Sequence, residues 1–177
     1  MEAKRETEGQ YFPPIPPPPP PPGIPVQVKQ IIGVGRCEEL LTPRITLFPP
    51  AIEIKDIHMR VEVEEALVCT DHVIVNAILH KNVNYKAKKV IPKIGGSKIR
   101  AEDVRCGDVR FCRASFPFSC LIKVPGARKG DRAEVLEAGV LDDCAFEFLE
   151  REGLVLREKI VVVVVVKVVR EVERFIK

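Results

Sequence analysis

The sequence has no tryptophan, and aromatic residues make up only 6% of its 177 residues. This scarcity disfavours a stacking platform for single-stranded nucleic acid, which needs aromatic side chains. No apolar run approaches the roughly 20 residues of a transmembrane helix, because the longest one, at 160–166, is far shorter. The polar N-terminus, MEAKRETEGQ, is followed by no apolar signal segment. We therefore expect synthesis in the cytoplasm and no membrane partner.

The motifs of common enzymes and nucleotide-binding proteins are also missing. Gly33 and Gly35 form a GxG without the third glycine of a dinucleotide loop, and the GGSK at 95–98 lacks the full phosphate-loop pattern. Asp71 and His72 could form a base and its orienting acid, but no GxSxG supplies a nucleophile. The sequence therefore predicts no catalytic residues, no cofactor-binding residues and no small-molecule substrate, and we expect a protein that is not an enzyme.

Cysteine is present six times, at positions 37, 69, 106, 112, 120 and 144, but no CxxC occurs. Cys69 and His72 could supply half of a zinc site, to be completed by Cys106 and Cys112, although their spacing fits no standard pair. We predict no metal ligands and interpret most of these thiols as small buried hydrophobes. Their later oxidation is left open.

Residues 1–25 are predicted to be a disordered, proline-rich tail. Seven consecutive prolines at 16–22 favour a polyproline II rod roughly 22 Å long. Such a rod is a spacer or a ligand for aromatic grooves, and the spacer needs no partner. The domain itself is predicted to span residues 26–177.

Short runs of alternating or β-branched residues dominate the domain. We expect strands over 26–34, 54–63, 66–69, 73–85, 109–114, 119–124, 133–141, 144–150 and 154–169, with a short helical turn at 36–41. Six consecutive valines at 161–166 predict a central strand that is buried on both faces. The fold class expected is all-β, an antiparallel β-sandwich or a flattened barrel.

The clearest alternation is VIVNAILHKNVNY at 73–85, whose apolar positions fall on one face of a strand. Its other face holds Ile74 and Ile78 but is more polar. With nearby lysines its polar residues form a candidate contact surface: Asn76, His80, Asn82, Asn84, Lys88, Lys89 and Lys93.

Charge is unevenly distributed along the domain. Residues 86–113 contain nine Lys/Arg against three acidic residues, and residues 131–158 contain nine acidic residues against three arginines. These stretches are two solvated surfaces or a complementary pair used in assembly. The basic stretch, or the polar face near His80, could alternatively bind a glycan or a nucleic acid, but the sequence does not favour nucleic acid.

Several separated segments resemble a known family. FPPAIEIKDIHMRVEVEEALVCTDHVIVNAILHKNVNYK, then FPFSCLIKVPGARKGDRAEV and the valine-rich strand, are similar to the SPOCS domain over about residues 45–172. The matching positions are 75–85, Pro117-Phe118, Val124-Pro125-Gly126 and Gly130. The SPOCS domain occurs in spore-coat assembly proteins of spore-forming Firmicutes, such as the SipL-like morphogenetic protein.

This resemblance implies a non-catalytic, β-rich module that helps to build the spore coat or envelope. Family members with a clear role often carry a LysM domain, and none is recognised in these 177 residues. We therefore expect a small structural protein, made in the mother-cell cytoplasm and placed in the coat or exosporium. Its expected partners are other spore-envelope proteins or other copies of itself.

Overall fold

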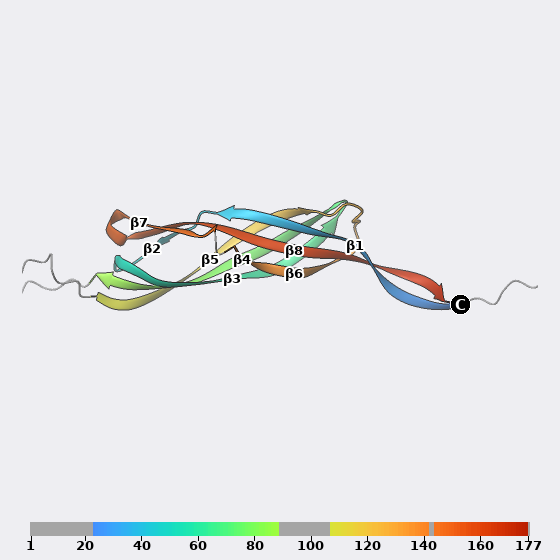
Figure 1. Ribbon diagram of the computed structural model, residues 1–177, viewed down its shortest axis with the longest axis horizontal. Coiled ribbons are helices and arrows are strands. Elements are labelled where there is room, and N and C mark those ends of the chain that lie inside the picture. The colour runs from blue at the N-terminus through green and yellow to red at the C-terminus, as the bar shows by residue number, and fades with distance from the viewer. Residues whose placement is uncertain (1–22, 89–106, 142–143, 177) are drawn as a thin grey trace, which may run out of the picture.

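The computed structural model describes residues 23–88, 107–141 and 144–176, which form two antiparallel β-sheets packed face to face (Figure 1). This arrangement confirms the predicted fold class and resolves it to an open sandwich, since the two sheets do not close into a barrel.

The first sheet has the strand order β3-β4-β5, with β3 at Ala51–Cys69, β4 at His72–Lys88 and β5 at Gly107–Lys123. β3 and β4 form a hairpin, and Asp71 turns the chain with φ 59°. The alternation in β4 gives buried residues at nearly every odd position from Val73 to Ala87. The apolar face predicted for 73–85 is therefore the face that packs on the second sheet.

The second sheet is built around β8, at Val155–Ile176. Over 162–169, β8 pairs with both β1 (Ile24–Leu41) and β6 (Arg132–Val140), and over 155–157 it pairs with both β2 (Arg44–Thr46) and β7 (Phe146–Glu150). A 3-10 turn, η2 at Arg151–Gly153, connects β7 to β8. The valine run thus lies in a central strand, as predicted.

Two clusters of side chains fill the space between the sheets. The larger cluster joins the odd positions 73–79 of β4 and buried residues of β5 to the even positions 160–168 of β8. The smaller cluster lies at the other end, where Leu47 and Leu156 pack against Val83 and Tyr85. The two sheets are therefore held together along most of the length of β4.

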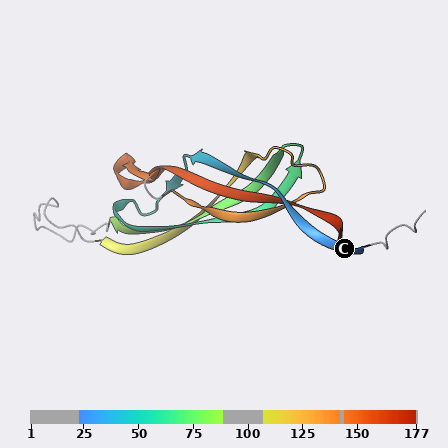
Figure 2. The same cartoon turned by 45° about the vertical axis from the view of Figure 1, so that its right-hand side comes forward.

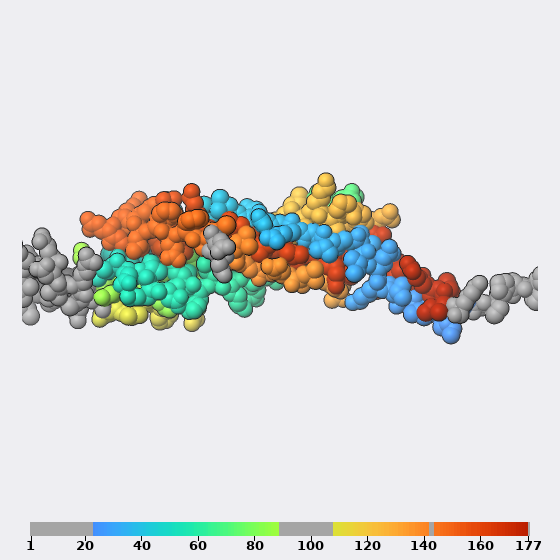
Figure 3. All heavy atoms as spheres, in the orientation of Figure 1, coloured from blue at the N-terminus to red at the C-terminus, as the bar shows by residue number. Residues whose placement is uncertain are grey.

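A two-stranded arm extends beyond this core. It consists of residues 24–31 of β1 paired with residues 169–176 of β8, and both views of the ribbon show it leaving the sandwich (Figures 1 and 2). The molecule narrows there in the space-filling view (Figure 3). At the tip, Ile24 is 74% exposed and Phe175 is 66% exposed.

Three local predictions were wrong. Residues 36–41 are not a helical turn, because they continue β1 and pair with residues 160–165 of β8. The predicted strands at 54–63 and 66–69 are one strand, β3, with a register shift between Val63 and Glu65 where the two were expected to separate. The strands at 109–114 and 119–124 are joined through Pro117 into β5, which tolerates a proline because it is the edge strand of its sheet.

Candidate interaction surface

The solvent-facing side of the β3-β4-β5 sheet is the most strongly patterned polar surface of the sandwich. Its centre is the outward side of β4, and we call it the outer polar face: Asn76, His80, Asn82 and Asn84 of β4 together with their partners on β3 and β5. Asn82 is exposed, and the other three are partly covered by neighbouring side chains. The structure therefore brings these four predicted residues together on one side of one strand.

One cross-strand row links all three strands through Asn76. Its Nδ2 donates a hydrogen bond of 3.1 Å to Glu65 Oε2 on β3, and its Oδ1 accepts one of 2.8 Å from Ser119 Oγ on β5. Both ends of the amide are thus engaged, which fixes its orientation. Neighbouring side chains of this kind stabilise a sheet as cross-strand pairs.

A second row is centred on His80. The Nδ1 atom of His80 lies 3.0 Å from Ser115 Oγ on β5, and its Nε2 atom lies 3.3 Å from Glu62 Oε2 on β3. Arg60 Nη2 donates a hydrogen bond of 2.7 Å to the same carboxylate. The histidine is therefore held between two strands, in a network of surface side chains.

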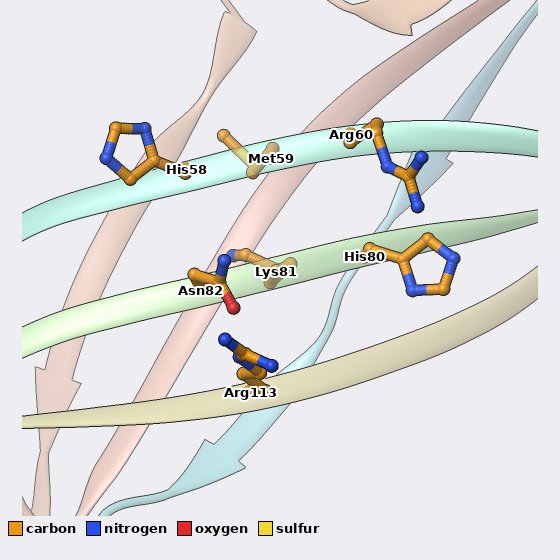
Figure 4. A pocket seen from close by; sticks show the side chains of 7 residues that line it. All are labelled: His58, Met59, Arg60, His80, Lys81, Asn82 and Arg113. Atoms are coloured by element: carbon orange, nitrogen blue, oxygen red, sulfur yellow. The ribbon is translucent and has the colours of Figure 1, made fainter.

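A shallow, open depression of about 410 Å³ lies between the His80 row and the neighbouring row of His58, Asn82 and Arg113 (Figure 4). Its outward lining comes from three adjacent strands: His58, Arg60, His80, Asn82 and Arg113. His58 Nε2 also lies 2.6 Å from Asp56 Oδ2. Guanidinium, imidazole and amide groups here are all suited to hydrogen bonding with a polar partner.

The lysines predicted for this surface are only partly placed. Lys88 is exposed at the end of β4, opposite Gly107. Lys89 and Lys93 lie outside the described residues. Most of the basic stretch at 86–113 also lies outside the described residues, so nucleic-acid binding by this stretch stays a prediction.

Beneath the outer polar face lies a buried ion pair that the sequence interpretation missed. Lys81 of β4 and Glu158 of β8 are each 1% exposed, and Lys81 Nζ contacts Glu158 Oε2 across the core. Apart from this contact, neither atom has a hydrogen-bond partner among the described residues. Burial raises the pKa of the Glu158 carboxyl, against the opposing effect of the Lys81 ammonium. A signal was present, since each residue occupies an inward position of an alternating strand.

Among the described candidate zinc ligands, Cys112 lies far along β4 from Cys69 and His72. Cys69 Sγ donates to the carbonyl oxygen of His72 within the β3–β4 turn, whereas Cys112 lies opposite Val83 toward the far end of β4. Cys106 lies outside the described residues. Within residues 23–88, 107–141 and 144–176, no group of three or more His, Cys, Asp or Glu side chains is placed to hold a metal ion.

Asp71 has a structural contact rather than the role of a base's partner. Its Oδ1 accepts a hydrogen bond of 2.7 Å from the backbone N–H of Gly126, and its own N–H donates to Ala127 O. Arg170 of β8 also reaches this loop, because its Nη2 donates to Gly126 O. The loop after β5 thus ties the β3–β4 turn to the second sheet.

Two carboxylates of the acidic stretch at 131–158 form ion pairs with basic side chains of the same sheet. Glu134 contacts both Lys29 and Lys167, and Glu150 contacts both Arg44 and Arg157. These pairs support the interpretation of this stretch as a solvated, locally neutralised surface.

The described residues thus form an all-β sandwich with a row of polar side chains along the outward side of one sheet. The chain belongs to the SipL, SPOCS domain family, whose family model matches residues 50–146. This match contains β3, β4, β5 and β6, whereas β1, β2 and β8 lie outside it. No curated protein and no solved structure matches the chain.

The family is one of non-catalytic domains, and it connects this chain to SipL-like, sporulation-related proteins. In the described part of the chain, no helix is both long and apolar enough to cross a membrane.

Proposed function

We propose that this protein is a non-catalytic structural component of the spore coat or envelope, which binds other envelope proteins through the outer polar face. The observation that carries the proposal is that the family match covers the whole sheet that bears this face. Envelope assembly is what the family relationship suggests for such a module.

The geometry of the face supports a macromolecular partner. Small-molecule sites are concave and mostly apolar, whereas this surface is open and polar. Hydrogen bonds already hold Asn76 and His80 in place, so less side-chain freedom is lost when a partner binds. An ordered, polar and nearly flat surface suits docking between proteins.

The test is a fluorescent fusion followed through sporulation, with two arginine variants. Arg113→Glu reverses a charge in the depression, and Arg132→Glu reverses an exposed charge on β6 of the opposite sheet. We expect wild type and Arg132→Glu to collect around the developing spore, and Arg113→Glu to lose most of that signal. Thermal unfolding of both purified variants checks that each still folds. A diffuse wild-type signal at all stages would overturn the proposal.

A glycan partner is the alternative that the depression favours. Asn82 and Arg113 present an amide and a guanidinium side by side, and both groups can hydrogen-bond sugar hydroxyls. Co-sedimentation of the purified protein with an insoluble glycan, at physiological salt, tests this alternative. Binding that Arg113→Glu abolishes and Arg132→Glu leaves intact would favour a glycan over a protein partner.

A further inference from the structure

The edge strands β1 and β5 belong to different sheets but come unusually close at two glycines. A side-chain carbon on Gly33 would lie 3.1 Å from Val124 Cγ1, and one on Gly35 would lie 2.7 Å from the carbonyl oxygen of Lys123. The same carbon on Gly35 would also overlap Ile122 Cγ2. Stacked sheets are ordinarily about 10 Å apart. The missing side chains therefore let β1 lie directly against β5.

This crossing places two thiols opposite each other. Gly33 faces Val124, the residue after β5, whereas Gly35 faces Val124, Lys123 and Ile122, so the contacts move into β5 as β1 proceeds from Gly33 to Gly35. Two residues further in the same directions are Cys37 and Cys120, which share the inward phase of their strands. Cys120 belongs to the larger core cluster, and Cys37 packs against that cluster.

The environment of Cys120 agrees with this proximity. Burial raises the pKa of the Cys120 thiol to about 12, and the neighbouring Cys37 thiol acts in the same direction. Cys120 is 7% exposed, whereas Cys37 is only partly buried at the edge of its sheet. Cys37 is thus the thiol that a reagent from solution reaches first.

We propose that Cys37 and Cys120 form an intramolecular disulfide that joins the two sheets when the protein meets a small-molecule disulfide. The Cys37 thiolate attacks one sulfur of that oxidant, which releases one small thiol and leaves a mixed disulfide. The Cys120 thiolate then attacks the Cys37 sulfur and releases the second small thiol. Two protons leave the cysteines, and two electrons pass to the oxidant, which ends as two thiols.

The buried partner makes this reaction slow at neutral pH. Only the thiolate attacks, and Cys120 is almost entirely protonated near pH 7. Ring closure should therefore speed up about tenfold for each pH unit between pH 7 and pH 9. Because the bond would join two strands far apart in the sequence, it should raise the thermal midpoint by roughly 5–15 °C.

The experiment uses the full chain in three versions. The first is wild type. The second keeps only Cys37 and Cys120, with the other four cysteines changed to serine. The third is a matched control that keeps only Cys69 and Cys112, which are both half-buried and lie toward opposite ends of the first sheet. Each folded protein is incubated with oxidised glutathione at pH 7, 8 and 9.

Non-reducing electrophoresis and peptide mass mapping then identify the bonds formed. We expect an intramolecular Cys37–Cys120 disulfide in the first two proteins, a pH-dependent rate, and a raised melting midpoint that a reductant reverses. We expect glutathione adducts or no reaction in the control. Glutathione that remains on Cys37 without ring closure, or bonds formed only between molecules, would overturn the proposal.

Discussion

The two sheets of the sandwich handle their outward sides differently. In the β3-β4-β5 sheet, the outward positions of β4 are mostly polar and are linked to their neighbours by side-chain hydrogen bonds. In the other sheet, β8 presents valines on both sides, and even the outward-facing Val163 and Val169 are only 1% and 3% exposed. Both strands are flanked on two edges, so the difference lies in their outward residues, which are mostly polar on β4 and include several valines on β8.

This comparison shows what each sequence pattern reports. Strict alternation, as in β4, marks a strand with one side in the core and one side free to contact a partner. A continuous valine run marks a strand that is buried on both of its faces. The polar outward side that we propose as a contact surface is on the alternating sheet, which packs against the valine-rich sheet.

The largest expected effect comes from breaking the ion pair where the two sheets meet. Lys81→Met leaves Glu158 buried without its counter-charge, which should cost about 3–5 kcal/mol of unfolding free energy in denaturant titration. The double variant Lys81→Met/Glu158→Leu removes both charges and should be near wild type or more stable by about 1–4 kcal/mol. A double variant as unstable as the single one would show that the pair itself is needed.

The same single variant has a defined pH dependence. Burial raises the pKa of Glu158 in the folded protein above its value in the unfolded chain. Between these two pKa values the folded protein binds more protons than the unfolded chain, so the free energy of unfolding falls as the pH rises. The loss caused by Lys81→Met should accordingly be larger at pH 8 than at pH 5. An equal loss at both values would mean that Glu158 titrates normally.

A smaller effect is expected from two glycines of the second sheet that flank β8. Gly35→Ala places a carbon against Ile122 and the Lys123 carbonyl, and such overpacking costs about 1–3 kcal/mol. Gly139→Ala is the matched control, because no atom lies within 4 Å of its new carbon. It should be neutral or slightly stabilising, since glycine weakens a strand interior. Equal effects would show that β1 and β5 do not need their close contact.

Much of the fold could be predicted, because alternation and turn residues are local signals. The buried side of 73–85 and the central position of the valine run both follow from short patterns. The strand at 36–41 was missed because a charged run with Leu40 and Leu41 also fits a helical turn. Its pairing with β8 is a long-range interaction that overrides local preference.

The candidate site was predictable only in part. Asn76, His80, Asn82 and Asn84 fall on one side of β4 by period alone, and their partners on β3 and β5 depend on strand register. Lys81 breaks the apolar pattern of 73–85 at an inward position, which was a visible warning of a buried charge. Glu158 pairs with Lys81 because of how one sheet is offset over the other, and no local sequence pattern encodes this offset.

The smallest expected effect concerns the loop that ties the two sheets together at one end. Hydrogen bonds from Arg170 hold the pKa of the Asp131 carboxyl below its usual range, with N–O distances of 2.6 and 2.7 Å. A lowered folded pKa gives stability that is present above the unfolded value of about 3.9 and is lost as the pH falls through the folded pKa. Asp131→Asn should therefore lower the thermal midpoint at pH 7, and its difference from wild type should shrink as the pH falls below about 4.

Asp56→Asn, at an exposed pair on the outer polar face, should change the midpoint less at either pH, because exposed ion pairs contribute little. If Asp56→Asn proved the more harmful variant, the outer polar face would be the stabilising part of the molecule, and its freedom to serve as a contact surface would have to be reconsidered.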